Sequence, residues 1–192
     1  MTPSAPVTRH FLFLVASARR DGNAEQLARR AAVGLPAAAT QTWLHLADLP
    51  LPAFTDLRHV TAENWTPAVE GHARTLLAAT LAATDLVIVA PVYWYSLPAA
   101  AKLYLDHWSA WLRAPGWDFK ARMAGKTMWG VSTFSDTDPR FAAPLADTLR
   151  LSADYMKMPW GGHLLGSGNR PGEVLNDSAA LAAAEKFFAP AR

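Results

Sequence analysis

Short apolar runs alternate with stretches of helical periodicity along the whole chain. The apolar runs have the length and residue types of strands, and they span residues 10–15, 40–46, 85–90, 126–132 and 161–166. The stretches between them are rich in alanine and leucine and predict helices at about 23–33, 67–83, 98–112, 143–156 and 178–188. This alternation predicts an α/β fold, with a parallel sheet, right-handed crossovers and helices on both faces.

The strand patterns also suggest an order for the sheet. Asp85–Ala90 is continuously apolar, as expected of a central parallel strand covered on both faces. Thr40–Leu46 instead alternates, with Trp43 and His45 on one face. Five such strands suit the doubly wound order 2-1-3-4-5, which opens a ligand crevice at the carboxyl ends of strands one, three and four. We therefore expect a single domain over residues 1–192, with residues 1–8 as a flexible N-terminus.

Composition narrows the class of protein further. Hydrophobic residues make up 51% of the chain, which excludes a disordered chain, and a formal charge of +2 without a basic stripe argues against nucleic-acid binding. The chain has no cysteine, so disulfides and thiolate chemistry are excluded, and its six histidines lack metal-ligand spacing. No apolar run approaches the roughly 18 residues of a membrane span, and no signal-peptide pattern opens the chain. We expect a cytoplasmic protein without a metal site.

The loop after the first strand is the most informative segment for function. It joins a strand to a helix start, where free N–H groups and the helix dipole favour an anion. Ser17 and Asn23 can hydrogen-bond phosphate oxygens, Arg19 adds charge, and Gly22 lets the backbone come close. The alternative is an ordinary helix cap, with Asp21 or Asn23 as the capping residue.

Two further loops carry groups suited to a flat ligand. Residues 91–96 offer three successive aromatics, and residues 132–136 offer hydroxyls and Phe134. Aromatic rings and free backbone N–H groups suit a heteroaromatic ring. Alternatively, the aromatics form a hydrophobic or dimer patch, and the hydroxyls cap the next helix. Taken together, the three loops predict a site for a planar ring system with a phosphate tail.

Two of these segments resemble motifs of the flavodoxin-like flavoproteins in the NADPH-dependent FMN reductase and NAD(P)H quinone reductase superfamily. The pattern S-x-R-x-x-G-N-[TS] is matched by residues 17–23, with Ala24 at its last position, and P-x-Y-x-x-S-x-P-x-x-x-K is matched by residues 91–102, followed by Asp106. The resemblance covers about residues 9–166 and implies a flavodoxin-like three-layer sandwich. It also implies noncovalent FMN, NADPH or NADH as co-substrate, and a quinone, free flavin or similar small molecule as electron acceptor.

By the same resemblance, three sets of residues would surround FMN, and none would serve as a catalytic acid or base. The phosphate set is Ser17, Arg19, Gly22, Asn23 and Ala24. The set bordering the isoalloxazine is Pro91, Val92, Tyr93, Trp94 and Ser96. The third side is Ser132, Thr133, Phe134 and Ser135.

The chain departs from the family pattern in two places. Ala24 stands where a Thr or Ser is usual, so one hydroxyl contact to phosphate is missing and only the backbone N–H of Ala24 remains. The aromatic-rich segment Trp108–Phe119 lies outside the common motifs, and we interpret it as a lid or a dimer contact. Its aromatics, including Trp111 and Trp117, predict a homodimer or tetramer.

Several other features receive ordinary structural interpretations. The triplet 125–127 is a turn into the fourth strand rather than a phosphate loop, and residues 166–172 form a flexible loop that could border the nicotinamide or a partner subunit. His45 and His163 are satisfied structural residues, and Lys102 with Asp106 is a surface ion pair. Two other functions stay open: a flavodoxin-type electron carrier, which would be expected to be acidic, and a flavin-binding module without turnover.

Overall fold

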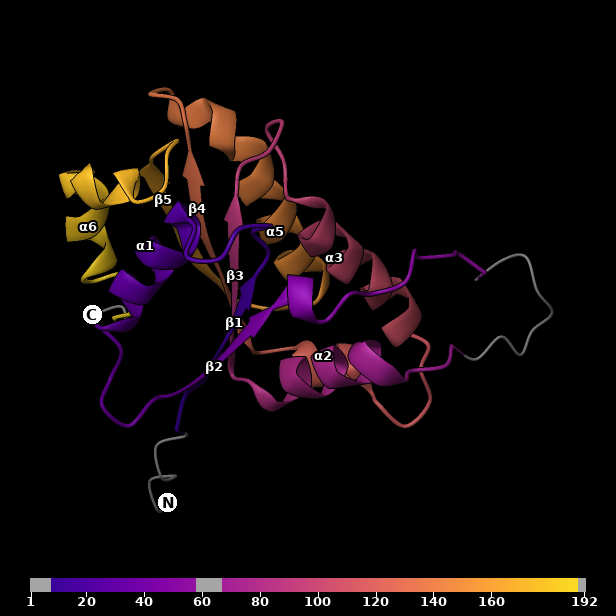
Figure 1. The fold of residues 1–192 in the computed structure, drawn as a ribbon. Coiled ribbons are helices and arrows are strands. Elements are labelled where there is room, and N and C mark those ends of the chain that lie inside the picture. The colour runs from indigo at the N-terminus through magenta and orange to yellow at the C-terminus, as the bar shows by residue number, and fades with distance from the viewer. Residues whose placement is uncertain (1–7, 58–66, 190–192) are drawn as a thin grey trace, which may run out of the picture.

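The computed structural model describes residues 8–57 and 67–189. Its centre is a five-stranded sheet in the order β2-β1-β3-β4-β5, with every neighbouring pair parallel (Figure 1). The expected α/β class and strand order are confirmed. Of the expected flexible N-terminus, residues 1–7 lie outside the described residues. The strands are β1 (His10–Val15), β2 (Thr40–His45), β3 (Asp85–Pro91), β4 (Thr127–Phe134) and β5 (Trp160–Ser167).

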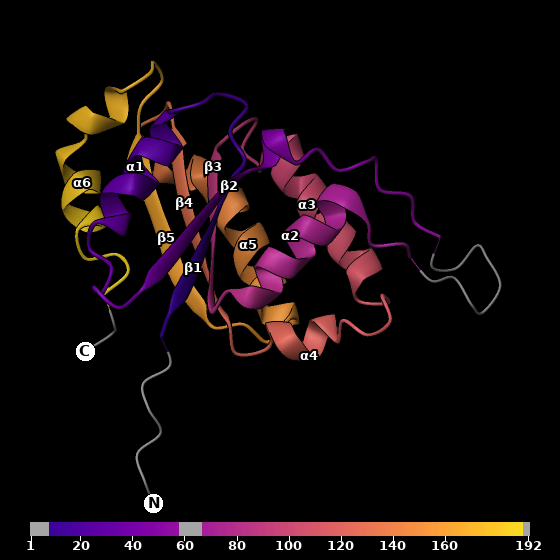
Figure 2. The same ribbon diagram turned by 60° about the horizontal axis from the view of Figure 1, so that its bottom comes forward.

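Helices cover both faces of the sheet and give it two separate cores (Figures 1 and 2). The side chains of β1 alternate between them: Phe11 and Phe13 pack with the helices of one face, and Leu12 packs with those of the other. None of the described helices is long and apolar enough to cross a membrane. One face carries α1 (Asn23–Ala32) and α6 (Ser178–Ala184), and the other carries α2 (Gly71–Ala82), α3 (Ala99–Trp111) and α5 (Ala143–Tyr155).

The ends of several elements differ from the sequence-based bounds. α2 begins four residues later than predicted, because Glu70 is extended and Gly71 takes a φ of +51°. α6 ends at Ala184, and the two phenylalanines that follow it turn their rings onto Trp129. β4 continues through Phe134, so the end of this strand reaches further into the predicted site region than expected.

The aromatic-rich segment is part of the core, so its interpretation as a lid or a dimer contact is wrong. Trp108 and Trp111 on α3 are buried, and so is Phe119, which begins the short, unpredicted helix α4 (Phe119–Met123). The Phe119 ring lies 5.6 Å from each tryptophan ring, edge to face. Trp117 is half-buried and packs against the same cluster. α4 folds the segment back onto the protein, with Phe119 packed against the two tryptophans of α3.

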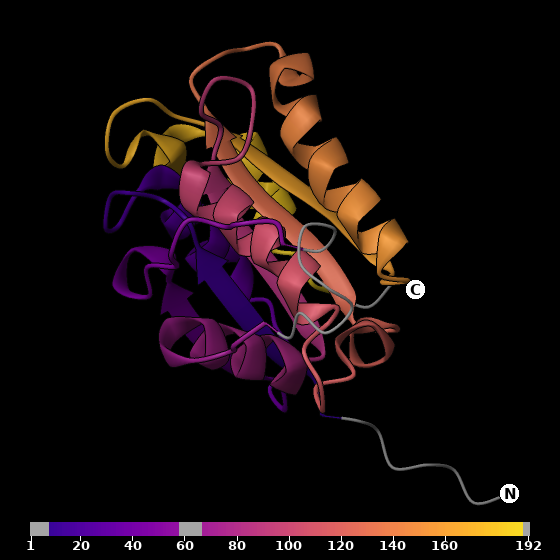
Figure 3. The ribbon, with the colours of Figure 1, turned by 90° about the vertical axis from the view of Figure 1, so that its right-hand side faces the viewer.

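The loops that follow the strands gather at one end of the sheet, opposite the start of β1 (Figure 3). Parallel strands place all their carboxyl ends at the same edge, so loops far apart in sequence meet there. These loops are residues 16–22, 92–98, 135–138 and 168–172.

Candidate functional site

A cleft of about 240 Å³ opens at the carboxyl ends of the strands, between α1 and the loops after β3, β4 and β5. It brings together most of the residues singled out from the sequence, although they come from three separate stretches of chain. We call it the main cleft. Its lining residues are Ser17, Arg19, Gly22, Asn23, Ala24, Pro91, Val92, Tyr93, Thr133, Phe134, Ser135, Gly168 and Asn169.

The first turn of α1 faces this cleft without a side-chain cap. Gly22 is the N-cap residue in an extended conformation, and no side chain accepts from the first N–H groups. The alternative cap by Asp21 or Asn23 is therefore wrong: Asp21 has a φ of +50°, and Asn23 is the first helical residue. A Cβ atom on Gly22 would lie 3.1 Å from Ser17 Oγ, so glycine permits this tight approach. Uncapped N–H groups at a helix start are suited to an anion.

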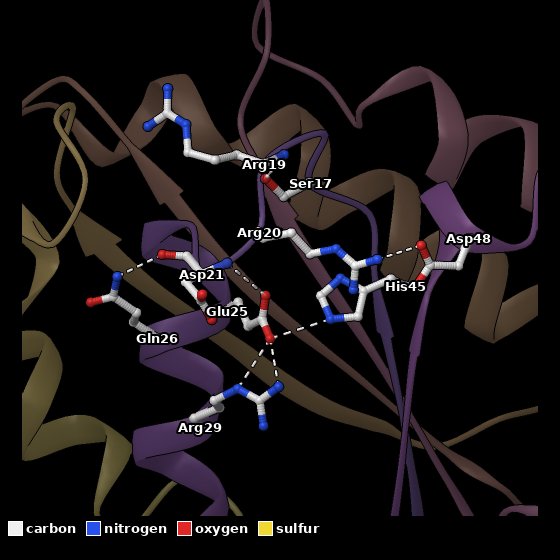
Figure 4. Close-up of polar contacts among 9 residues, drawn as sticks. All are labelled: Ser17, Arg19, Arg20, Asp21, Glu25, Gln26, Arg29, His45 and Asp48. Carbon is white, nitrogen blue, oxygen red and sulfur yellow. Dashed lines mark hydrogen bonds and ion pairs between the residues drawn. The ribbon is translucent and has the colours of Figure 1, made fainter.

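Hydrogen bonds within the first loop and from side chains of α1 hold the loop in place (Figure 4). Ser17 Oγ accepts the N–H of Arg19 at 3.1 Å. The carboxylate of Glu25 accepts the N–H of Asp21 at 3.2 Å, and Gln26 Nε2 donates to the carbonyl of Asp21 at 2.6 Å. None of these contacts uses an N–H group from the first turn of α1. The loop is thus fixed while its anion-facing groups stay available.

The buried carboxylate of Glu25 is neutralised by residues that do not line the main cleft. Arg29 donates to it through Nε at 3.0 Å and through Nη2 at 2.6 Å, and His45 Nε2 lies 3.4 Å away (Figure 4). Burial of a carboxylate is unfavourable unless it is paired, and Arg29 supplies the pairing. His45 is therefore a satisfied residue, as expected from the sequence.

The two arginines of the first loop have different surroundings. Arg20 pairs with Asp48 beyond the end of β2. The guanidinium of Arg19 is exposed, has no hydrogen bond or ion pair among the described residues, and extends away from the Glu25 contacts (Figure 4). Arg19 is thus the cation available to a negatively charged ligand in the main cleft.

The loop after β3 forms a tight hairpin beside the cleft. The backbones of Tyr93 and Ser96 bond to each other at 3.0 and 3.1 Å. Trp94 and Tyr95 at its tip both have positive φ, at 49° and 64°, which is unusual for bulky residues. The Trp94 side chain is 93% exposed and, like Ser96, does not line the main cleft.

Trp94 and Tyr95 instead line a neighbouring depression of about 210 Å³, which we call the aromatic hollow. The rings of Tyr95 and Phe141 lie 5.6 Å apart across it. It shares Val92, Phe134 and Ser135 with the main cleft, so the two spaces lie next to each other. The full lining is Val92, Trp94, Tyr95, Phe134, Ser135, Asp136 and Phe141.

Ser132 lies beneath the site rather than in its wall. It is fully buried on β4, and its hydroxyl hydrogen-bonds His163 Nε2 of β5. Burial lowers the pKa of His163 to about 4, so this imidazole is neutral at ordinary pH. His163 is a satisfied structural residue, in agreement with the sequence analysis.

Gly168 and Asn169 line the main cleft and were not among the predicted site residues. Their stretch was interpreted as a flexible loop, and the expected crevice involved only the first, third and fourth strands. One sequence feature could have identified these two residues: their glycine-rich stretch directly follows the fifth strand, at the same edge of the sheet. Among the described residues, no group of three or more His, Asp or Glu side chains could hold a metal ion.

Comparison with known proteins agrees with this architecture. The model of the family described as flavodoxin-like fold matches residues 9–187. The Bacillus subtilis (strain 168) protein YwqN, whose name proposes an NAD(P)H-dependent FMN-containing oxidoreductase, is 31% identical over 171 residues, covering 88% of this chain and 91% of YwqN.

Two solved structures have similar folds. That of the Trp repressor binding protein from Bacillus subtilis superposes with a TM-score of 0.75 at 26% identity, covering 95% of this chain and 99% of that one. An NAD(P)H:quinone oxidoreductase from Methanothermobacter marburgensis superposes with a TM-score of 0.68 at 14% identity, covering 96% of this chain and 98% of the other.

Proposed function

This chain belongs to the flavodoxin-like fold family, and we propose that it is an FMN-dependent NAD(P)H oxidoreductase that passes electrons from a nicotinamide to a quinone, a free flavin or a similar small acceptor. The observation that carries the proposal is the main cleft, in which an uncapped helix start and an unpaired arginine lie next to an aromatic wall. The name of YwqN, a relative along nearly the whole chain, supports the same chemistry.

The phosphate end of the cleft fits a phosphate monoester. We assign the phosphate to Ser17, Arg19 and the N–H groups that begin α1 at Asn23 and Ala24. Asn23 also has a buried side-chain oxygen without a partner in the described structure, which a ligand hydroxyl could satisfy. Ala24 supplies its N–H and no hydroxyl.

The other end of the cleft fits a flat ring. Pro91, Val92 and Tyr93 would border it on one side, and Thr133, Phe134 and Ser135 on the other. We assign Trp94 to the approach of the acceptor through the aromatic hollow, Ser96 to holding the hairpin, and Ser132 to supporting β4 through His163.

The protein would contribute orientation rather than acid–base chemistry. FMN, when bound, supplies the redox reaction by taking up a hydride from the nicotinamide and giving electrons to the acceptor. The lining residues of the main cleft include no Asp, Glu, His or Lys, and the chain has no cysteine. Binding, shielding from water and alignment of the ring are thus the tasks left to these side chains.

Assembly and compartment belong to the same proposal. We propose that the protein is cytoplasmic. We also propose that it forms a homodimer or tetramer, because Trp94, Tyr95 and Phe141 leave apolar surface exposed at the mouth of the site. The buried aromatics of α3 do not support an oligomer. Light scattering at micromolar concentration measures the oligomeric state, and a monomer would contradict the proposed assembly.

Flavin titration and turnover test the proposed function. Purified apo-protein is titrated with FMN by flavin fluorescence, and NAD(P)H oxidation is then followed with benzoquinone, free flavin and an azo dye as acceptors. Saturable binding with turnover is expected. Absence of binding at tens of micromolar FMN would overturn the proposal, and binding without turnover would favour an electron carrier or a binding module.

A further inference from the structure

The loop after β5, residues 168–172, closes one side of the main cleft, and we call it the fourth loop. Its first residue is tied to the neighbouring strand, since the N–H of Gly168 donates to the carbonyl of Phe134 at 2.9 Å. Beyond the loop, Val174 is fully buried in the same core as Leu27 of α1. The fourth loop is thus anchored at both ends beside the phosphate end of the cleft.

One carboxylate organises the fourth loop from outside the cleft. Glu173 accepts the N–H groups of both Asn169 and Arg170, each at 2.8 Å. These bonds hold the pKa of Glu173 below its usual range. The contacts support the loop backbone and keep Asn169 in the cleft wall, in a stretch that the sequence predicts as a flexible loop.

The fourth loop also contacts the helix start that we assign to phosphate. The buried Asn23 donates through Nδ2 to the carbonyl of Arg170 at 2.9 Å. The same side chain keeps its Oδ1 buried and unpartnered in the described structure. A buried acceptor without a donor is unfavourable, and a ligand hydroxyl would supply the missing donor.

Gly168 makes this contact possible. A Cβ atom at this position would lie 2.7 Å from the backbone nitrogen of Val174 and 2.9 Å from Asn23 Nδ2. Both distances are shorter than real Cβ contacts, and one involves backbone that cannot move aside. Only glycine lets the fourth loop approach Asn23 this closely.

We propose that the fourth loop is a further wall of the ligand site and binds the ribityl-phosphate tail of the flavin, with Asn169 and Asn23 Oδ1 as contacts and Glu173 as the positioning residue. The inference rests on the proposed function and adds residues that the two sequence motifs do not contain. We assign the fourth loop to the polyol phosphate and not to the ring, because the loop contacts Asn23, the first residue of α1.

The test compares three flavins that share one ring. FMN, riboflavin and lumiflavin, which lacks the ribityl tail, are titrated into wild-type, Asn169→Ala, Glu173→Ala and Glu173→Gln proteins by flavin fluorescence. We expect Asn169→Ala and Glu173→Ala each to raise the Kd for FMN about tenfold and to leave that for lumiflavin unchanged. Glu173→Gln keeps one acceptor oxygen and should fall between wild type and Glu173→Ala.

The controls separate the possible failures. Glu185→Ala removes an equally negative, exposed side chain outside the main cleft and should leave all three affinities unchanged. A wild-type protein that binds no flavin would contradict the proposed function itself. Wild-type binding of FMN with unchanged Kd in Asn169→Ala and Glu173→Ala would overturn the fourth-loop proposal alone. Equal weakening of FMN and lumiflavin would overturn it too, because the loop would then act on the ring or the fold.

Discussion

Neighbouring residues of the first loop have opposite surroundings although their chemistry is the same. Arg19 is unpaired beside the main cleft, and Arg20 is paired with Asp48 away from it. The sequence motif singled out Arg19, and the structure gives a physical reason to separate the two: a cation already paired has less to offer an incoming anion. The chain therefore contains its own matched control for phosphate binding.

Replacement of Arg19 by alanine should weaken FMN without weakening riboflavin. A charge-assisted contact to phosphate is worth on the order of 1.5–3 kcal/mol, and riboflavin lacks the phosphate. Fluorescence titration of both ligands measures the difference. Arg20→Ala should leave the ratio of the two affinities near that of wild type, and equal weakening of both ligands by Arg19→Ala would show that Arg19 contacts something other than phosphate.

His163 should make stability depend on pH in a mildly acidic range. Burial lowers its pKa from 6.5 to about 4, so below pH 6.5 the unfolded chain takes up a proton that the folded chain resists. The stabilising contribution is present above pH 6.5 and is lost as the pH falls toward 4, at a cost of about 2–3 kcal/mol. Urea unfolding of wild type and His163→Gln over this range measures it. Identical pH dependence in the two proteins would contradict the assignment.

At the scale of elements, the sequence predicted strands and helices well and their ends less well. Runs such as Asp85–Ala90 are continuously apolar and short, so the strands followed from the pattern, and their order followed from the doubly wound topology that this alternation favours. α4 was missed because its five residues are too few for a helical period to show. The fourth loop was predicted as a flexible loop that could border the nicotinamide or a partner subunit, and its contact with the start of α1 was missed because Asn23 lies far away in the sequence.

The hairpin after β3 should control the approach of the acceptor. Trp94 stands at its tip over the aromatic hollow and outside the main cleft, so Trp94→Ala should change the ranking of acceptors by kcat/KM and leave FMN affinity nearly unchanged. Steady-state NAD(P)H oxidation with benzoquinone at several fixed cofactor concentrations should give parallel double-reciprocal lines, since nicotinamide and acceptor would use one site in turn. Intersecting lines, or a loss of FMN affinity in the variant, would count against this role.

At the scale of the whole molecule, the sheet divides the protein into two cores, and the aromatics of α3 belong entirely to one of them. Because these side chains are buried within one subunit, they are not evidence for contacts between subunits. Rings that looked too numerous for a small monomer are covered by α4 and the sheet, so their number reflects the size of a core.

Trp111→Ala should therefore destabilise each subunit rather than separate subunits. Truncation of a fully buried aromatic removes about 3–5 kcal/mol of stability through lost burial and the cavity left behind. Thermal unfolding followed over a range of protein concentrations measures this, with the loss in Tm expected at every concentration. A loss of Tm that disappears at high protein concentration would instead indicate an intersubunit contact.

The contacts that fix the first loop from outside the cleft have a kinetic consequence. Because Glu25 and Gln26 already hold Asp21, the loop need not order itself when a ligand arrives, and little conformational entropy is lost at that moment. Encounter then requires only diffusion into a preformed opening. Among variants of this site, differences in affinity should appear chiefly as differences in residence time, with arrival rates nearly constant.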